Sequence, residues 1–157
     1  MNITTYIGVD PATRTGFAYY FPFSNEATVF ECPGNPLEQW AFLKAMIEMC
    51  PSSLVCMEVL HHFRNAITTR DILQRSGYLK WSSTSFGYTP REVSTPVIRS
   101  FLKCKSKEEV KELFAPHYSG IGRFTDNHSD ALAVAMFSAY LDGHLQELEI
   151  PKIGALT

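Results

Sequence analysis

Four acidic residues of this chain lie where predicted strands end or a predicted helix begins, and not inside those elements. Asp10 follows the apolar run at 6–9, and Glu58 follows the apolar run at 54–57. Asp126 and Asp130 lie at the start of an apolar-periodic stretch that reaches Leu141. Two strand ends and a helix start can meet at one point, and converging carboxylates favour a hard divalent cation such as Mg²⁺ or Mn²⁺. The pattern therefore predicts a metal-dependent phosphoryl-transfer enzyme, with a nuclease as the leading hypothesis.

The order of the apolar runs predicts an α/β domain around one sheet. We expect strands at 4–9, 15–21, 27–30 and 54–57, a less regular strand at 86–93, and helices at 37–49, 69–81, 96–102, 107–114 and up to 141. The spacing of Ser106 and Glu109 is that of a capping box, and Thr68 and Asp71 have a similar spacing.

A length of 157 residues with 45% hydrophobic content fits one domain with a sizeable core. We expect this domain to cover residues 1–142 and a poorly ordered tail to cover residues 143–157. No run approaches the roughly 18 to 20 apolar residues that span a bilayer, and the first residues do not resemble a signal peptide. These features predict a soluble intracellular protein without a membrane partner, cytoplasmic if the source is bacterial or phage.

The sequence contains no motif for several other chemistries. The four cysteines form no CxxC pair, which predicts free thiols. The five histidines have no HExxH spacing, which argues against zinc hydrolysis. Neither a GxxxxGK[ST] phosphate loop nor a GxSxG element occurs.

The net charge of −2 conceals an uneven distribution. Residues 1–60 carry −4, residues 61–111 carry +6, and residues 112–157 carry −4. A basic middle third beside an acidic site is what phosphate binding needs. Alternatively, several of these basic residues belong to solvated helix faces.

Each acid also has a purely structural interpretation. Asp10 precedes Pro11 and can cap a turn, and Glu58 can pair with Arg64. Asp126 can be the N-cap of the last helix. Asp130 is harder to explain in this way, because the residues after it are apolar and a buried charge needs a partner.

The spacing at the last helix leaves the identity of a fourth ligand open. Residues three or four apart share a helix face, so Asp126 or Asn127 can stand beside Asp130. His128, two positions before Asp130, would normally face away, but an irregular first turn of the helix leaves it open as a third candidate.

Three ordered segments together resemble the RuvC-like Holliday-junction resolvases of the RNase H-like superfamily, and we expect a viral or phage-type member. They are IGVDPATRTGFAYY at 7–20, CMEVLHHFRNAITTRDILQRSGYLKW at 56–81 and DNHSDALAVAMFSAY at 126–140. The resemblance implies a mixed five-stranded sheet flanked by helices, a homodimer, and cleavage of branched DNA.

The resemblance also assigns site residues. It implies that Asp10, Glu58 and Asp130 are metal ligands, with Asp126 favoured over Asn127 as the fourth. It implies that Lys107 contacts the reacting phosphate. Residues implied to contact DNA are His61, Phe63, Arg64, Arg99, Lys103 and Lys105, with the aromatic ring of Phe63 positioned to stack on unpaired bases.

The implied reaction is hydrolysis with two Mg²⁺ ions per active site, which Mn²⁺ can replace, leaving 5′-phosphate and 3′-hydroxyl ends. Paired symmetric nicks on a four-way junction are the leading hypothesis, and helicase or recombination partners are left open. Three alternatives are a broader nuclease for flaps, forks and Y-branches, a module that binds branched DNA without cutting it, and half of an actin-like ATPase.

Overall fold

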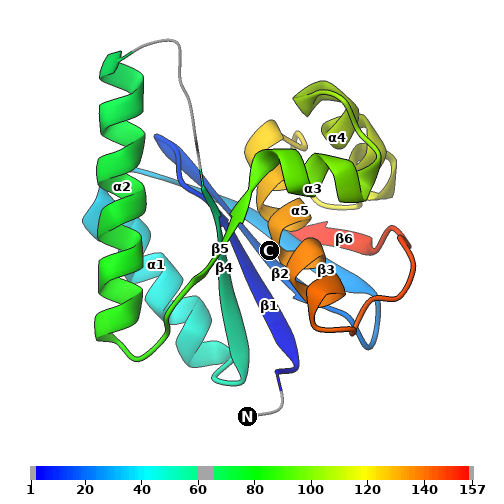
Figure 1. Ribbon diagram of the computed structural model, residues 1–157, viewed down its shortest axis with the longest axis horizontal. Helices are drawn as coiled ribbons and strands as arrows, with labels where there is room; N and C mark the ends of the chain where they lie inside the picture. Colours follow the sequence, from blue (N-terminus) through cyan, green and yellow to red (C-terminus); the bar gives the residue numbers. More distant parts are fainter. Residues whose placement is uncertain (1–2, 60–65, 156–157) are drawn as a thin grey trace.

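The computed structural model describes residues 3–59 and 66–155. Its elements are β1 (Thr5–Asp10), β2 (Arg14–Phe21), β3 (Glu26–Pro33), α1 (Pro36–Met49), β4 (Ser53–Val59), α2 (Ala66–Ser85), β5 (Arg91–Ser94), α3 (Thr95–Leu102), α4 (Lys107–Phe114), the 3₁₀ turn η1 (Ala115–His117), α5 (Asp126–Leu141) and β6 (Lys152–Ala155) (Figure 1).

A mixed sheet forms the centre of the molecule. In the described residues it has six strands in the order β5-β4-β1-β2-β3-β6. The strands β1, β2 and β3 form an antiparallel meander, whereas β4 pairs in parallel with β1 and β5 in parallel with β4. The carboxyl ends of β1 and β4 therefore lie at the same edge of the sheet.

Helices cover both faces of this sheet (Figure 1). On one face, Ile7 and Val9 of β1 pack with Leu43 of α1 and Leu79 of α2. On the other face, Tyr6 packs in the cluster that includes most of α5. Alternate residues of a strand point to opposite faces. Asp10 has the same parity as Tyr6, so its side chain belongs to the α5 face.

Two glycines allow α5 to lie directly on the sheet. A Cβ atom on Gly8 of β1 would lie 1.9 Å from the carbonyl oxygen of Ala131, and one on Gly16 of β2 would lie 2.1 Å from that of Asn127. Only glycine permits backbones to approach this closely. The first turns of α5, which carry Asp130, are thereby held against β1 and β2.

The prediction of an α/β sheet flanked by helices is confirmed, but two details are wrong. The sheet has six described strands and not five. Residues 143–157, expected to be a poorly ordered tail, contain the sixth strand. They include β6, which pairs in parallel with the outer edge of β3 and buries Ile153. The unpaired backbone groups of β3 supply the partners that make this four-residue strand stable.

Of two predicted helix starts, one agrees with the structure and the other differs. The side chain of Ser106 accepts a hydrogen bond from the backbone N–H of Glu109, which confirms the predicted cap of α4. The helix expected from residue 69 begins instead at Ala66, so Thr68 lies in its first turn. None of the described helices combines the length and the apolar character needed to cross a bilayer.

Candidate metal centre

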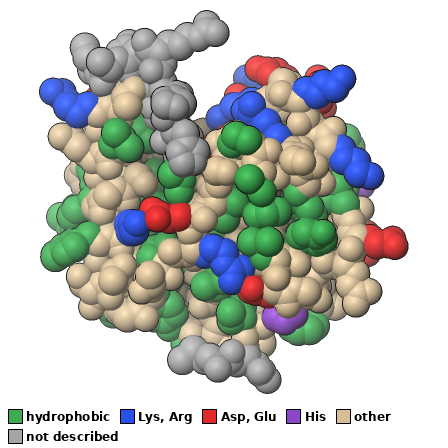
Figure 2. Space-filling model, viewed as in Figure 1, with side chains coloured by type: hydrophobic (Ala, Val, Ile, Leu, Met, Phe, Trp, Pro, Cys, Tyr) green, Lys and Arg blue, Asp and Glu red, His purple; other side chains and the backbone are tan. Residues whose placement is uncertain are grey.

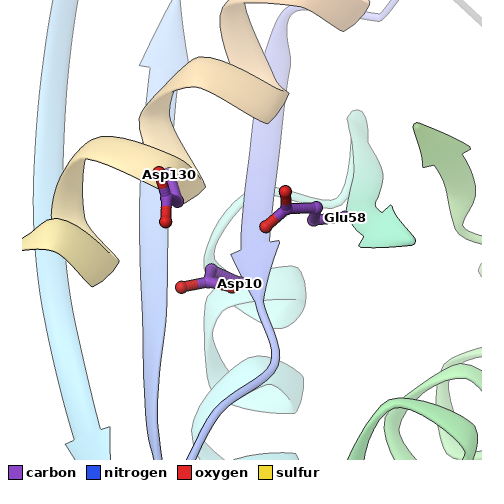
Figure 3. A group of neighbouring side chains, drawn as sticks. All are labelled: Asp10, Glu58 and Asp130. Atoms are coloured by element: carbon purple, nitrogen blue, oxygen red, sulfur yellow. The ribbon is translucent and has the colours of Figure 1, made fainter. Parts of the chain in front are cut away.

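Three carboxyl groups converge at the edge of the sheet where β1 and β4 end (Figure 3). Asp10, Glu58 and Asp130 each offer an oxygen, and these oxygens lie within 4.8 Å of one another. Asp10 is 4% exposed and Glu58 is 5% exposed, whereas Asp130 is less completely buried. The structure thus brings together the three acids that the sequence places at element ends.

The register of the sheet explains this convergence. The strands β1 and β4 pair in parallel, and Val9 and Met57 are the last paired residues. Asp10 and Glu58 each come directly after that pair, so they lie side by side. Both side chains point to the α5 face, because Cys56 packs in the same cluster as Tyr6. Asp130 reaches them from the first turns of α5, which Gly8 and Gly16 hold against the sheet.

Burial and mutual repulsion shift the protonation of these acids. Burial raises the pKa of Asp10 well above its ordinary value, and the nearby carboxyl groups of Glu58 and Asp130 raise it further. Burial also raises the pKa of Asp130 to about 6, although Lys107 opposes this rise. The shifts indicate that the cluster holds more negative charge than its surroundings stabilise.

Lys107 on α4 supplies a positive charge at the edge of the cluster. Its Nζ atom lies 2.5 Å from Oδ2 of Asp130. Burial alone would lower the pKa of Lys107, but Asp130 and Asp10 outweigh that effect and raise it. Lys107 is therefore a charged ammonium group at neutral pH, and its side chain stays 38% exposed.

Thr95, the first residue of α3, contacts the cluster from another side. Its hydroxyl donates a short hydrogen bond to Oε1 of Glu58. A donor of this kind fixes the orientation of a ligating carboxylate. Thr95 could not be recognised as a site residue from the sequence, because a threonine before Pro96 suggests only a helix start.

Asp126 and Asn127 do not join the three carboxyl groups. Asp126 Oδ1 lies 2.8 Å from Nζ of Lys111, and Asp126 is absent from the acid cluster found among the described residues. The Asn127 amide donates to the backbone oxygen of Arg14 at 2.9 Å and to Glu31 Oε1 at 3.0 Å. These contacts give no support to either residue as a fourth ligand.

His128, the third candidate for a fourth ligand, makes its contacts at the start of α5. Its Nδ1 accepts a hydrogen bond from the backbone N–H of Thr125 at 3.2 Å, and its ring packs against Phe124 and Tyr118. Because Nδ1 is an acceptor, the neutral ring carries its proton on Nε2. His128 therefore caps α5.

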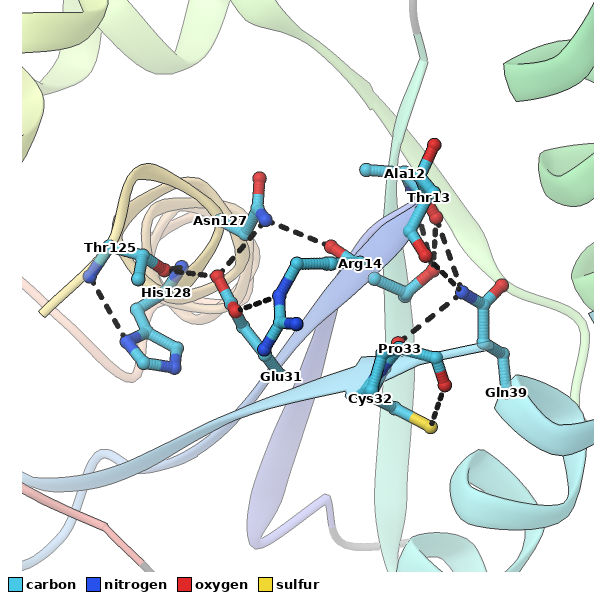
Figure 4. A network of polar contacts seen from close by, with 11 residues as sticks. Ala12, Thr13, Arg14, Glu31, Cys32, Pro33, Gln39, Thr125, Asn127 and His128 are labelled. Atoms are coloured by element: carbon cyan, nitrogen blue, oxygen red, sulfur yellow. Dashed lines mark hydrogen bonds and ion pairs between the residues drawn. The ribbon is translucent and has the colours of Figure 1, made fainter. Parts of the chain in front are cut away.

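Glu31 on β3 connects the start of α5 to the sheet (Figure 4). It accepts hydrogen bonds from Thr125 Oγ1, Asn127 Nδ2 and Arg14 Nε. Burial alone would raise the pKa of Glu31, but these donors outweigh it and lower the pKa. No pattern in the sequence indicated this role, because the predicted strand ended at residue 30.

The expected DNA-contacting residues are only partly placed. His61, Phe63 and Arg64 lie outside the described residues. Arg99 lies in the last turn of α3, Lys103 caps that helix with a left-handed backbone, and Lys105 lies in the connection to α4. Figure 2 shows Lys and Arg side chains over the part of the molecule that holds α4.

An apolar groove lies away from the acidic cluster. Its volume is about 860 Å³, and its lining includes Val97 and Phe101 of α3 and Phe137 and Tyr140 of α5. Figure 2 shows apolar side chains over these two helices. None of the three clustered acids lines the groove, so the acidic site is a separate feature.

The donor chemistry of the cluster fits a divalent cation. Carboxylate oxygens are the ligands that Mg²⁺ and Mn²⁺ prefer. Three carboxyl groups beside one ammonium group leave a negative charge that such an ion would neutralise. Asp10, Glu58 and Asp130 are therefore the residues that would hold it.

Comparison with known proteins supports the fold independently. No protein-family model and no curated protein sequence matches the chain. Among solved structures, Thermus thermophilus RuvC in complex with a Holliday junction substrate has a TM-score of 0.70 and 15% identity, with 88% of this chain and 95% of that chain covered. Another Thermus thermophilus RuvC structure has a TM-score of 0.64, 16% identity and the same coverage. The chain therefore has a RuvC-like fold of the RNase H-like class.

Proposed function

We propose that this chain is a divalent-metal-dependent endonuclease that resolves four-way DNA junctions by paired symmetric nicks. The observation that carries the proposal is the convergence of Asp10, Glu58 and Asp130 beside Lys107. The RuvC-like fold adds support, because one of the similar structures is described as a complex with a Holliday junction substrate.

The cluster would bind the metal ions through carboxylate oxygens. We propose two Mg²⁺ ions per site, for which Mn²⁺ could substitute. When bound, they would acidify the attacking water and neutralise charge on the leaving oxygen. Thr95 holds the carboxyl group of Glu58 by a hydrogen bond. Gly8 allows α5 to keep Asp130 close to β1.

Lys107 would act on the DNA directly. Its partly exposed ammonium group can leave Asp130 and donate to a non-bridging oxygen of the reacting phosphate, where it stabilises developing negative charge. The water oxygen bonds to phosphorus and loses a proton to solvent, the bond from phosphorus to the 3′ oxygen breaks, and that oxygen takes up a proton from solvent. The products are a 5′-phosphate and a 3′-hydroxyl.

Binding of the junction would extend from the cluster along the basic segment. Arg99, Lys103 and Lys105 belong to α3 and its connection to α4, the helix that carries Lys107. They would neutralise backbone phosphates on either side of the cut. His61, Phe63 and Arg64 remain candidates for contacts at the branch point.

Paired nicks require two sites, and we propose that a homodimer supplies them, since a two-fold dimer matches the pseudo-symmetry of a four-way junction. Segments 37–49 and 72–79 are both apolar enough for the interface. Leu43 and Ile47 of the first lie in the core. The exposed apolar residues of this segment, Leu37 and Met49, lie at opposite ends of α1. On α2, Leu73 is 54% exposed and Trp81 is 68% exposed, so we favour the α2 face.

The proposal is tested with four labelled DNA substrates: a four-way junction, a three-way junction, a flap and a linear duplex. Each is incubated with Mg²⁺, then with Mn²⁺, and with the wild-type protein or Asp10→Asn. We expect symmetric, ligatable nicks on the four-way junction, absent with Asp10→Asn. Equal cutting of the flap and the three-way junction would indicate a broader nuclease, and binding without cutting would indicate a recognition module.

A further inference from the structure

Gln39 is a polar side chain without exposure to solvent, located on α1 and therefore on the sheet face opposite α5. A buried amide is costly unless its donors and acceptor are satisfied. Its Nε2 atom lies 3.2 Å from the carbonyl oxygen of Ala12, 3.3 Å from those of Thr13 and Cys32, and 3.5 Å from that of Gly34 (Figure 4).

The surroundings determine which way this amide points. Nε2 has two hydrogens, and they are shared among four carbonyl oxygens, which accept only. Oε1 lies 3.2 Å from Nη1 of Arg75, which is a donor only. In the reverse orientation, Oε1 of Gln39 would face the carbonyl oxygens and its NH₂ group would face the guanidinium group of Arg75. Only one orientation therefore satisfies both ends of Gln39.

Two of the carbonyls that Gln39 binds, those of Ala12 and Thr13, belong to the turn that directly follows Asp10. Residues 11–13 connect β1 to β2 and take no part in the ladder between these strands. Apart from Gln39, the hydroxyl of Thr15 contacts this turn, donating to Ala12 at 3.0 Å. The conformation of the turn therefore depends on donors from side chains.

Arg75 connects this arrangement to α2. Its Nη1 atom donates to Gly34 at 2.8 Å as well as to Gln39. Gln39 is thus the point where the Asp10 turn, the end of β3 and α2 are joined. A rearrangement of any one of these segments would break hydrogen bonds to the other two.

We propose that Gln39 is a positioning residue for the acidic cluster: its amide holds the 11–13 turn so that Asp10 keeps its place beside Glu58 and Asp130. Gln39 does not contact substrate and acts through the backbone that follows Asp10. The inference rests on the proposed function, because the proposed function requires the cluster to bind a metal ion.

The test compares two variants that each lose side-chain hydrogen bonds, one next to the carboxyl end of β1 and one near its start. Gln39→Met keeps a similar volume but removes both donors and the acceptor. The matched control is Tyr6→Phe, at the other end of β1, which removes a hydroxyl bonded to Asp142 and His144 at 2.8 Å each. Thermal unfolding of both variants identifies a temperature at which both are folded.

At that temperature, Mn²⁺ binding is measured by titration with detection of the free ion. We expect Gln39→Met to weaken binding by about 10-fold or more, the usual loss for an outer-shell partner of a metal site. Tyr6→Phe should retain the wild-type affinity. Unchanged Mn²⁺ affinity in Gln39→Met, or an equal loss in both variants, would overturn the positioning role while the proposed function stands.

Hydrogen exchange provides a readout that does not depend on metal. Without Mn²⁺, the backbone amides of residues 12–14 should exchange faster in Gln39→Met than in wild type or Tyr6→Phe. Unchanged exchange there would also overturn the inference. If the wild-type protein binds no Mn²⁺, the proposed function fails, and the exchange rates alone decide whether Gln39 holds the turn.

Discussion

Nζ of Lys107 lies 2.5 Å from Oδ2 of Asp130, and this ion pair joins α4 to α5 at the acidic cluster. One helical turn away on both helices, Nζ of Lys111 lies 2.8 Å from Oδ1 of Asp126. The two pairs have similar geometry but different surroundings, because Asp126 is outside the cluster and its side chain is 48% exposed. The second pair therefore serves as a control for the first.

Replacing Lys107 by alanine should slow cleavage much more than it weakens metal binding. Loss of a donor that stabilises transition-state charge costs about 10²- to 10³-fold in rate. Mn²⁺ affinity should be kept or improved, because the ammonium group competes with a cation for the same carboxylates. Single-turnover cleavage and Mn²⁺ titration check both statements.

Lys111→Ala is the control for that experiment. It removes a similar charge from the same helix, and its cleavage rate at saturating protein should stay near that of wild type. Equal losses in the two variants would mean that Lys107 contributes only general positive charge.

Thr95→Val should weaken divalent-cation binding with little effect on folding. Valine keeps the shape of threonine but cannot donate to Glu58, so the carboxyl group loses the hydrogen bond that orients it. We expect Mn²⁺ affinity to fall by about 10-fold, at the lower end of the range for outer-shell partners. Thr95→Ser retains the hydroxyl and should restore most of the affinity; failure to do so would contradict this role.

Gly8→Ala should destabilise the protein strongly, because its Cβ would lie 1.9 Å from the backbone oxygen of Ala131. Overpacking typically lowers the free energy of unfolding by about 1–3 kcal/mol. We expect a loss at or above the upper end of this range, because the clash is with backbone atoms. Gly77→Ala is the matched control, since nothing lies within 4 Å of its Cβ position on α2. It should add about 0.5–1 kcal/mol of stability. Urea unfolding measures both, and equal effects would contradict the close approach of α5.

Asp142→Asn should lower stability at neutral pH but much less at acid pH. Partial burial would raise the pKa of Asp142, yet hydrogen bonds from Arg91 and Tyr6 outweigh it and lower the pKa. A lowered folded-state pKa stabilises the protein above the unfolded pKa, and this contribution is lost as pH falls through the folded value. A hydrogen bond to a charged group such as this carboxylate contributes roughly 1.5–3 kcal/mol to the free energy of unfolding.

Urea unfolding of wild type and Asp142→Asn at pH 7 and near pH 3 tests that dependence. The difference in unfolding free energy between the two proteins should shrink at the lower pH. A difference that is the same at both values would show that Arg91 and Tyr6 do not interact with a charged Asp142.

The three clustered acids were predictable because strand ends and a helix start are visible in the sequence. The apolar runs before Asp10 and Glu58 locate the ends of β1 and β4, and parallel pairing places both ends at one edge. Asp130 was predictable because an acid before a fully apolar helix face needs a partner.

The surroundings of the cluster were not predictable, because they depend on contacts between distant segments. Gln39 binds backbone carbonyls, which leave no residue pattern, and Glu31 reaches α5 only because β2 and β3 pair in the observed register. The strand β6 is four residues long, and its stability comes from the edge of β3, so local propensity could not reveal it.

The pairing of Asp126 shows the same limit. Its spacing from Asp130 suggested a shared metal, but its partner, Lys111, lies on another helix and could not be inferred from spacing along α5. The contacts of Asp126 and Asn127 therefore point to roles at the start of α5.

The most direct test of the central claim uses a supercoiled plasmid that extrudes a cruciform, which is a four-way junction in closed circular DNA. Paired nicks across the junction convert the plasmid to linear DNA, whereas independent single nicks give open circles. With Mg²⁺ and the wild-type protein, linear DNA should be the first product, and Asp10→Asn should produce none. Open circles as the lasting product, or cleavage that survives Asp10→Asn, would contradict a paired, metal-dependent resolvase.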